Sequence, residues 1–276
     1  MSSPTVPNLD PFSGIAGVRE AAKIETTDRI KAAIMGKPKS GKSWFAATAP
    51  PPVLVYDFSD RAESLAGKTG VFVKTLIDTQ QSPTVVKAIE ADLSLFQYKK
   101  KKGEPIPASV VFDEITNFLP YIKHDYLSLN PKDGRALRLG GNLVQIGMSY
   151  DWINVANGFL DYLITEYINL GCNIVFVFHE RDEKDQAESK VGDIKYTGMI
   201  TINPQFISPI LSKFNEVFRI TVKKQQANTL YTVDCKPTDE VLAASTLLLD
   251  ATEPPDLMAM IAKHKLRKSQ TEKKEK

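Results

Sequence analysis

Gly36-Lys37-Pro38-Lys39-Ser40-Gly41-Lys42-Ser43 is the stretch of this chain that decides its fold. The stretch fits the pattern G-x-x-x-x-G-K-[ST], in which glycines let the backbone curl and aim several N–H groups at phosphate oxygens. Residues 29–35 (RIKAAIM) predict a short buried strand before it, and residues 43–48 (SWFAAT) predict a helix after it. Because the N-terminus of a helix adds partial positive charge, this order of strand, loop and helix predicts a phosphate-binding loop, or P-loop.

The residue types of the P-loop predict a nucleoside triphosphate and a metal ion as its ligands. Lys42 is expected to reach the β- and γ-phosphates, and the Ser43 hydroxyl is expected to coordinate Mg²⁺. ATP and Mg²⁺ are therefore the expected cofactors, and the alternative is a basic, glycine-containing turn without a ligand. The residues expected to hold ATP are Gly36, Lys37, Pro38, Lys39, Ser40, Gly41, Lys42, Ser43 and Trp44.

A second apolar run, residues 108–112 (ASVVF), ends in two acidic residues, Asp113 and Glu114. In a P-loop fold such a strand places a carboxylate beside the loop, where it can hold Mg²⁺ through the water shell of the ion. Asp113 is the candidate for that role, next to Ser43. Glu114 comes directly after it and is a candidate for polarising the water that attacks the nucleotide.

Predicted strands and helices alternate along the chain. Apolar runs predict strands at 53–56, 71–76 and 174–178, helical spacing predicts helices at 83–98 and 150–170, and a hairpin is expected at 216–234. This alternation predicts an α/β fold with a doubly wound, mainly parallel sheet. We expect a flexible N-terminal arm at 1–27, a core at 28–250, and a C-terminal helix with a basic tail at 251–276.

Several polar segments are expected to lack regular structure. The glycine-rich, basic segment 131–147 is typical of a mobile loop, and the charged segment 181–201 is typical of a functional or disordered loop. The lysine run 99–102 is expected in a solvated loop, at the end of a helix whose N-cap would be Ser82. From residue 263 onward, seven Lys and Arg residues against two Glu predict a disordered basic tail.

The composition is that of an ordinary globular protein, with 42% hydrophobic and 25% charged residues among 276. No apolar run of 18 residues and no secretory signal is visible, so we expect no membrane span and a cytoplasmic protein. The formal net charge of +2 is too small to imply binding of a polyanion by itself. The two cysteines, Cys172 and Cys235, are expected to be free buried thiols rather than a disulfide.

Together these motifs resemble the RecA-like P-loop ATPases of bacteriophages, of the phage nucleotide-binding or single-strand-annealing recombination type. The resemblance covers about residues 29–239, and it rests on the P-loop, Ala49-Pro50 before the strand 53–57, Val110–Asp113, the strand closed by His179-Glu180, residues 207–213 and the strand 216–222. It implies a RecA-like core that forms a homo-oligomer, ring or filament, with ATP at the subunit interface. It also implies single-stranded DNA as a partner and the cytoplasm of a bacterial host as the location, and it leaves a single-strand-binding protein open as a second partner.

The resemblance implies roles for residues outside the P-loop as well. Two loops contact single-stranded DNA in that family, and by position they match residues 132–147 and 181–201. His179 lies where such proteins place a polar residue that senses the γ-phosphate and relays to the second loop. The alternative for His179 is a satisfied histidine at the end of a strand. The DNA-binding candidates in the two loops are Lys132, Arg135, Arg138, Lys190 and Lys195.

Two departures from the family pattern leave roles open. RecA-like proteins usually carry a glutamate just past the second strand to activate water, whereas residues 57–60 (DFSD) offer a serine near that place. Asp60, Glu63 and Glu114 are the alternatives for this role. The catalytic candidates are therefore Lys42, Glu114, Asp60 and His179. The basic motif that caps the ATP of a neighbouring subunit is matched only weakly, and the candidates for this trans-acting cation are Lys236, Lys223 and Lys224.

Three functions remain open at this point. The leading interpretation is an ATP-hydrolysing, DNA-dependent recombination protein that binds single-stranded DNA and assists annealing or strand exchange. The second is a P-loop kinase, in which Arg135 and Arg138 would serve as a lid over the phosphates. The third is a non-catalytic assembly factor that uses ATP as a switch, and the missing glutamate favours it. ATP turnover with and without single-stranded DNA separates the three.

Overall fold

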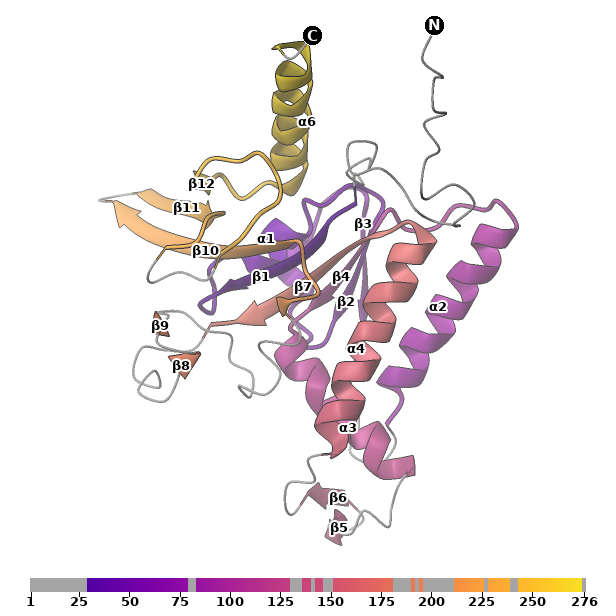
Figure 1. Ribbon diagram of the computed structural model, residues 1–276. Helices are drawn as coiled ribbons and strands as arrows, with labels where there is room; N and C mark the ends of the chain where they lie inside the picture. Colours follow the sequence, from indigo (N-terminus) through magenta and orange to yellow (C-terminus); the bar gives the residue numbers. More distant parts are fainter. Residues whose placement is uncertain are drawn as a thin grey trace, which may run out of the picture.

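The computed structural model describes residues 29–78, 83–129, 136–139, 142–145, 151–180, 190–191, 194–195, 211–225, 228–238 and 243–274. The arm expected at residues 1–27 lies outside these ranges. Figure 1 shows that the described part is built around one large sheet with helices packed on it. Within the described ranges, none of the helices combines the length and the apolar character that a membrane crossing needs.

The large sheet has eight strands in the order β12-β11-β10-β1-β7-β4-β2-β3 within the described part of the chain. The strands are β1 (Lys31–Gly36), β2 (Val53–Asp57), β3 (Val71–Thr75), β4 (Ser109–Asp113), β7 (Asn173–His179), β10 (Glu216–Gln225), β11 (Asn228–Asp234) and β12 (Thr252–Glu253). The strands from β10 to β3 run parallel, and β11 and β12 are added at the edge by antiparallel pairing. This topology confirms the predicted α/β fold with a mainly parallel sheet.

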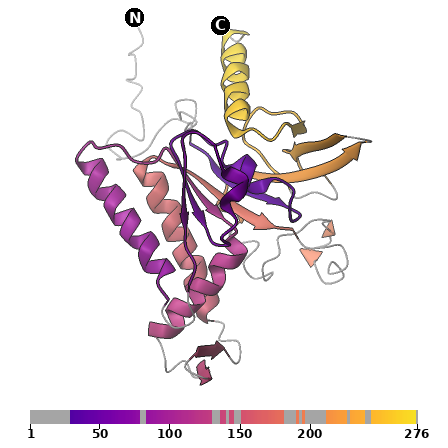
Figure 2. The same cartoon turned by 180° about the vertical axis from the view of Figure 1, so that it is seen from behind.

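Helices cover both faces of the sheet and bury two hydrophobic cores. The helices are α1 (Lys42–Ala46), α2 (Val85–Lys101), α3 (Ile115–Leu129), α4 (Asp151–Leu170) and α6 (Leu257–Lys274). Because side chains alternate along a strand, Ala33 and Met35 of β1 pack against α2, α3 and α4, whereas Ala32 and Ile34 pack on the side of α1 and α6. Figures 1 and 2 show α2, α3 and α4 on one side of the sheet and α1 on the other, with α6 extending away from the sheet.

The parallel strands bring chemically important positions to one edge of the sheet. Since β7 lies between β1 and β4, Gly36 at the end of β1 is in register with His179 at the end of β7. Asp113 at the end of β4 is in register with Asp57 at the end of β2. The carboxyl ends of parallel strands meet at the same edge, where α/β proteins place their ligands. The P-loop, His179 and two aspartates therefore lie at one edge.

A hairpin interrupts the segment 131–147, which is expected to be a mobile loop from its sequence. Strand β5 (Ala136–Leu139) pairs antiparallel with β6 (Asn142–Gln145), so the loop prediction is wrong for these residues. Gly140-Gly141 between them is a dipeptide that favours tight hairpin turns.

Helix α2 begins and ends differently from the sequence prediction. Its N-cap is Thr84 rather than the predicted Ser82. The Oδ1 atom of Asp78 accepts hydrogen bonds from the backbone N–H groups of Thr84 (2.7 Å) and Val85 (3.1 Å). The predicted lysine loop is also wrong, because Lys99–Lys101 form the last turn of the helix. Cations are favourable there since they face the negative end of the helix dipole.

The basic C-terminal tail is helical rather than disordered. Helix α6 continues to Lys274, because Lys, Arg, Gln, Glu and Leu are strong helix formers. Lys263 and Arg267 anchor it through ion pairs with Asp250 at 2.6 Å and 2.9 Å. The prediction of disorder from residue 263 onward is therefore wrong for 263–274.

Both cysteines, Cys172 and Cys235, are free and buried, which confirms the prediction that they form no disulfide. Burial raises the pKa of the Cys172 thiol to about 11 and that of the Cys235 thiol to about 12. Because the thiolate is the reactive form of cysteine, both side chains act as small core residues at neutral pH.

Candidate nucleotide-binding site

The P-loop connects β1 to α1 through a tight turn that requires glycine at two places. Gly41 has a φ of 85°, in the left-handed region, and its carbonyl accepts the hydrogen bond from the Phe45 N–H (2.9 Å) that starts α1. At Gly36 a Cβ atom would lie 2.8 Å from the Oγ atom of Ser40 and 3.0 Å from the carbonyl oxygen of Ile220. Any side chain at Gly36 would therefore push the loop away from the sheet.

A cavity of about 610 Å³ lies beside the P-loop at this edge of the sheet. It is lined by Pro38, Lys39, Ser40, Gly41, Lys42, Ser43, Trp44, Ser59, Arg61, Ser64, Asp113, Glu114 and His179. Of the residues predicted to hold ATP, Pro38 to Trp44 line this cavity, whereas Gly36 and Lys37 are not part of its lining. The structure thus brings together the P-loop, Asp113 at the end of β4, Glu114 directly after it, and His179 at the end of β7.

Lys42 is buried at the base of this loop. It is 5% exposed, and its Nζ atom donates a hydrogen bond to the carbonyl oxygen of Lys37 at 2.8 Å. Burial lowers the pKa of Lys42, while the carboxylates of Glu114, Asp113 and Glu180 oppose that shift. A partly desolvated ammonium group gains more from an anionic partner than an exposed one does. Lys42 is therefore well placed to bind phosphate oxygens.

Ser43 and Asp113, the candidates for holding a metal ion, both line the cavity. Burial raises the pKa of Asp113 to about 6, and a hydrogen bond from the Ser43 hydroxyl opposes the rise. The Oδ1 atom of Asp113 is buried without a hydrogen-bond partner among the described residues, which is costly for a carboxylate unless a cation is present. The described ranges hold no cluster of three or more His, Cys, Asp and Glu side chains that could cage a metal. The two side chains fit Mg²⁺, which keeps several waters and needs few protein oxygens beside phosphate.

Replacing Asp113 by asparagine is expected to weaken ATP binding only when Mg²⁺ is present. The variant keeps the shape of the side chain but loses the charge that holds the ion, and such losses typically reduce metal affinity about 10- to 100-fold. Isothermal titration with ATP, in Mg²⁺ and in EDTA, measures both conditions. In EDTA the variant should bind ATP as the wild type does, and equal affinities in Mg²⁺ would contradict the assignment of Asp113.

Glu114 is held at the wall of the cavity by two hydrogen-bonding side chains. Its Oε1 atom lies 2.5 Å from the Nε2 atom of His179, and its Oε2 atom accepts a hydrogen bond from the Nδ2 atom of Asn117 at 2.9 Å. The hydrogen bond with His179 lowers the pKa of Glu114 against the opposing effect of burial. The backbone φ of 70° at Glu114 is unusual for a residue with a side chain, and such conformations cluster at functional sites. Glu114 is ionised at neutral pH and can accept a proton from water.

Comparison with known protein families matches residues 28–247 to a family described as an AAA domain. The chain belongs to this AAA domain family. The matched range contains the P-loop, Asp113, Glu114 and His179, so the cavity belongs to a P-loop ATPase-like domain. A search among curated proteins found no match.

Of the three carboxylates predicted as candidates for activating water, one lines the cavity beside the P-loop of this AAA domain. Glu114 lines the cavity, whereas Asp60 and Glu63 are exposed and are not part of its lining. The left-handed backbone of Asp60 (φ 54°) turns the chain after β2, and its neighbours Ser59 and Arg61 line the cavity instead. The serine near the position of the missing family glutamate therefore reaches the site, and Asp60 does not.

Sequence reasoning did not single out Arg61 and Ser64, and it noted Ser59 only as the residue near the place of the missing glutamate; all three line the cavity. Asp57 positions this segment, because its carboxylate accepts hydrogen bonds from the Ser59 N–H (2.9 Å), the Ser59 hydroxyl (3.0 Å) and the Arg61 N–H (2.9 Å). The positive charge of Arg61 also contributes to the lowered pKa of Glu114. The sequence signal that could have identified these residues is their position just after the carboxyl end of β2, where α/β proteins place their ligands.

The candidate trans-acting cations lie on and beside the β10–β11 hairpin of the AAA domain. Lys223 and Lys224 are exposed and stand opposite Leu230 and Thr229 in register, and Lys236 is exposed just after β11. These three lysines are not part of the cavity lining within their own chain. Their action on the ATP of a neighbouring subunit stays a prediction.

Some of the candidate DNA-binding residues belong to short strands, and the others lie outside the described ranges. Lys132 and Arg135 lie outside the described residues, and Arg138 belongs to β5. Lys190 of β8 (Lys190–Val191) stands opposite Lys195 of β9 (Ile194–Lys195) in an antiparallel pair. Contact of these residues with DNA stays a prediction.

Proposed function

We propose that this AAA domain binds ATP with Mg²⁺ and hydrolyses it, and that the hydrolysis cycle controls its binding to single-stranded DNA during annealing or strand exchange. The hydrolytic part rests on one observation: the ionised carboxylate of Glu114 lines the same cavity as Lys42, Ser43 and Asp113. An ATP-binding factor without catalysis has no need of a proton acceptor at this place. The placement of Glu114 therefore favours an enzyme over a non-catalytic switch.

Each group of residues in the cavity would have a separate role in phosphoryl transfer to water. Glu114 accepts a proton as the water oxygen attacks the γ-phosphorus and the bond to the bridging oxygen of ADP breaks. The backbone N–H groups of the P-loop and the ammonium group of Lys42 hold the phosphates and stabilise the charge that develops on them. Ser43 and Asp113 would hold Mg²⁺, which when bound would supply further positive charge beside the phosphates. Asn117 and His179 orient Glu114 through the hydrogen bonds given above.

Contacts of two neighbouring residues at the end of β7 support a link between ATP hydrolysis and the segment that follows residue 180. His179 contacts Glu114, and the next residue, Glu180, is 6% exposed and fixed by Arg219 of β10. The guanidinium group of Arg219 donates from Nη2 to Oε1 (2.5 Å) and from Nε to both carboxylate oxygens of Glu180 (3.1 Å and 3.2 Å). A change at Glu114 on ATP binding would thus act at an anchored strand end. The charged segment 181–201 begins there, with four Lys and Arg residues against five Asp and Glu. Its match by position to a DNA-contacting loop of the RecA-like family, rather than its charge, supports DNA as the ligand controlled by ATP.

ATP turnover measured with and without single-stranded DNA tests this proposal. We expect DNA to raise turnover severalfold and the effect to fall steeply between about 50 and 200 mM salt, because contacts to the phosphate backbone release counterions. A duplex of the same length is the matched control and should stimulate less. Absence of DNA binding at low salt, with ATP and with a non-hydrolysable analogue, would remove the DNA part of the proposal.

The same measurements separate the two remaining alternatives. Transfer of the γ-phosphate to a small acceptor, without any effect of DNA, would indicate a kinase. ATP binding without turnover, together with an increase in particle size on adding ATP, would indicate an assembly factor that uses ATP as a switch. Particle size in ATP also tests the expected homo-oligomer, which would place ATP at the subunit interface.

A further inference from the structure

A second cavity of about 540 Å³ adjoins the P-loop and has no role in the chemistry described above. It is lined by Lys39, Ser40, Gly41, Trp44, Tyr231 and Pro255, and its surface is mostly apolar. Four of these residues, Lys39, Ser40, Gly41 and Trp44, also line the cavity that holds the catalytic groups. The two cavities therefore meet along the P-loop, and the charged groups Lys42, Asp113 and Glu114 line only the first.

Two aromatic side chains stand exposed at this apolar cavity. Trp44 is 46% exposed and Tyr231 is 40% exposed. The ring of Tyr231 lies against the P-loop, since a Cβ atom on Gly41 would be 3.6 Å from its Cδ1 atom and 3.7 Å from its Cε1 atom. Lys68 holds Trp44, with its Nζ atom 3.7 Å from the centre of the indole ring and hydrogen-bonded to the Trp44 carbonyl oxygen at 3.1 Å. Large aromatic rings kept partly in water next to a ligand site are suited to stacking.

We propose that this apolar cavity binds the aromatic base of the nucleotide whose phosphates occupy the P-loop, with Tyr231 as its main stacking partner. The inference rests on the proposed binding of ATP and adds the part of the site that recognises the base. A base has two apolar faces and a polar edge, so it matches a mostly apolar cavity that opens onto a phosphate site. Few polar side chains line this cavity, so stacking contributes more than hydrogen bonding to the recognition.

The C-terminal segment forms one wall of this base pocket. Pro255 lies beyond residue 247, where the match to the AAA domain family ends. The backbone N–H of Leu257 donates to the Oγ1 atom of Thr48 at 2.8 Å and so fixes the start of α6 to the end of α1. Because Thr48 follows the P-loop helix directly, the position of Pro255 is tied to the P-loop itself.

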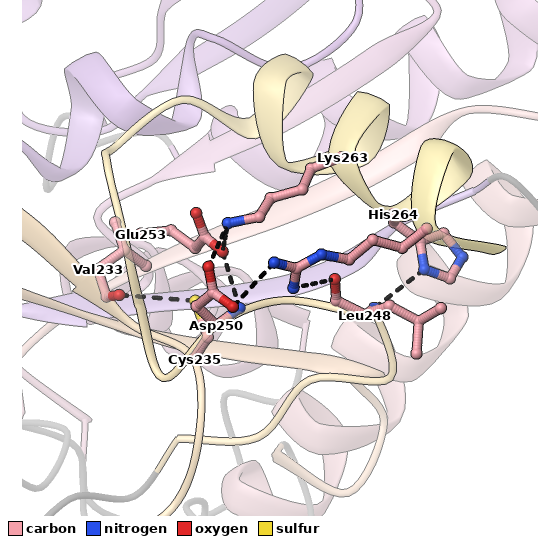
Figure 3. A network of polar contacts seen from close by, with 8 residues as sticks. Val233, Cys235, Leu248, Asp250, Glu253, Lys263 and His264 are labelled. Atoms are coloured by element: carbon pink, nitrogen blue, oxygen red, sulfur yellow. Dashed lines mark hydrogen bonds and ion pairs between the residues drawn. The ribbon is translucent and has the colours of Figure 1, made fainter. Parts of the chain in front are cut away.

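A polar network holds this segment in place. Lys263 of α6 donates to Glu253 and to Asp250, at 2.6 Å in each case, as Figure 3 shows. Glu253 is 6% exposed and belongs to β12, in register with Val233 of β11, two residues from Tyr231. The ion pair of Lys263 thus connects the helix to both sides of the pocket, to Pro255 along the chain and to Tyr231 across the sheet. We infer that α6 keeps the base pocket in its binding shape.

Binding of ATP compared with tripolyphosphate, which lacks base and sugar, tests the pocket. In the full-length chain, Tyr231→Ala should weaken ATP binding about 10-fold, in the range measured for loss of one aromatic stacking partner, and leave tripolyphosphate binding unchanged. Tyr231→Phe, which keeps the ring, should bind both ligands as the wild type does. Tyr98→Ala, an exposed tyrosine on α2, is the matched control.

Each outcome of this comparison decides the inference. Unchanged ATP affinity in Tyr231→Ala would overturn it, and so would an equal loss for ATP and tripolyphosphate, which would mean that Tyr231 only supports Gly41. Either result would leave the proposed function standing, because the wild type would still bind ATP and tripolyphosphate at the P-loop. If the wild type bound neither ATP nor tripolyphosphate, the proposed function would be overturned together with the inference.

The role of α6 has its own test. Lys263→Ala should weaken ATP binding severalfold without changing the affinity for tripolyphosphate. The substitution removes the ion pairs that hold the segment carrying Pro255 in place. Lys273→Ala, near the exposed end of the same helix, removes an equal charge away from the pocket and should have no effect. Equal ATP affinities in the two variants would overturn the role of α6 while leaving Tyr231 as the stacking partner.

Discussion

Replacing Lys42 by alanine is expected to abolish nucleotide binding, with Kd for ATP and for tripolyphosphate raised at least about 100-fold. The reason is electrostatic. The ammonium group is 5% exposed, so water screens its attraction to phosphate oxygens less than at the surface. Charge-assisted hydrogen bonds of this kind are among the strongest that a side chain can make. Isothermal titration in Mg²⁺ measures the loss.

The fold should tolerate the Lys42→Ala substitution, which makes the result interpretable. Burial lowers the pKa of Lys42, which means that the charged form is disfavoured in the folded protein before a ligand arrives. Removing the charge should therefore leave the melting temperature of the ligand-free protein unchanged or higher. Lys101→Ala, at the exposed end of α2, is the matched control for loss of a lysine. Undiminished ATP affinity in Lys42→Ala would remove the premise of the proposed function.

Replacing Glu114 by glutamine is expected to lower kcat for ATP hydrolysis about 100- to 10,000-fold while Kd for ATP changes little. Glutamine keeps the size of the side chain and can still bond to Asn117, but it cannot accept a proton from water. Because the carboxylate lies 2.5 Å from the Nε2 atom of His179, its orientation is already set before ATP binds. Steady-state turnover and equilibrium binding, measured on the same sample, separate catalysis from affinity.

Asp60→Asn is the matched control for Glu114→Gln, since it makes the same chemical change at an exposed carboxylate of the same edge. It should hydrolyse ATP at the wild-type rate. The reverse pattern, with turnover lost in Asp60→Asn and kept in Glu114→Gln, would place the catalytic carboxylate after β2. That is the position implied by the resemblance to RecA-like proteins, and the assignment of Glu114 would then fail.

The P-loop and the strand before Asp113 could be predicted because their signals are local. Gly36 and Gly41 satisfy backbone requirements within a few residues, and an apolar run closed by an acid marks a buried strand that reaches the edge of a sheet. The same local reasoning failed for Ser82 and for residues 263–274. At the start of α2, Asp78 accepts the backbone N–H of Thr84, six residues further on, and at α6 an ion pair of Lys263 with Asp250 adds to the helix propensity of the tail. Neither side-chain contact is visible in the residue pattern.

The choice between Asp60 and Glu114 shows more directly what the sequence pattern cannot decide. Both follow buried strands and both are acidic, so sequence pattern treats them alike. Asp57 accepts the backbone N–H of Arg61 and thereby fixes the turn that leaves Asp60 exposed, while His179, from a strand inserted between β1 and β4, holds Glu114 in the cavity. The decision depends on which strands are neighbours, which is a property of the assembled sheet.

The sequence by itself determined that this protein is an α/β P-loop domain with Lys42, Ser43 and Asp113 at its phosphate site, because each of these signals is complete within one strand, turn or helix. Only the tertiary structure decided which carboxylate reaches the cavity, and it alone brought Trp44, Tyr231 and Pro255 around one pocket. Those residues are separated by many positions in the chain, and strand order and helix docking, rather than spacing along the sequence, determine the distances between them.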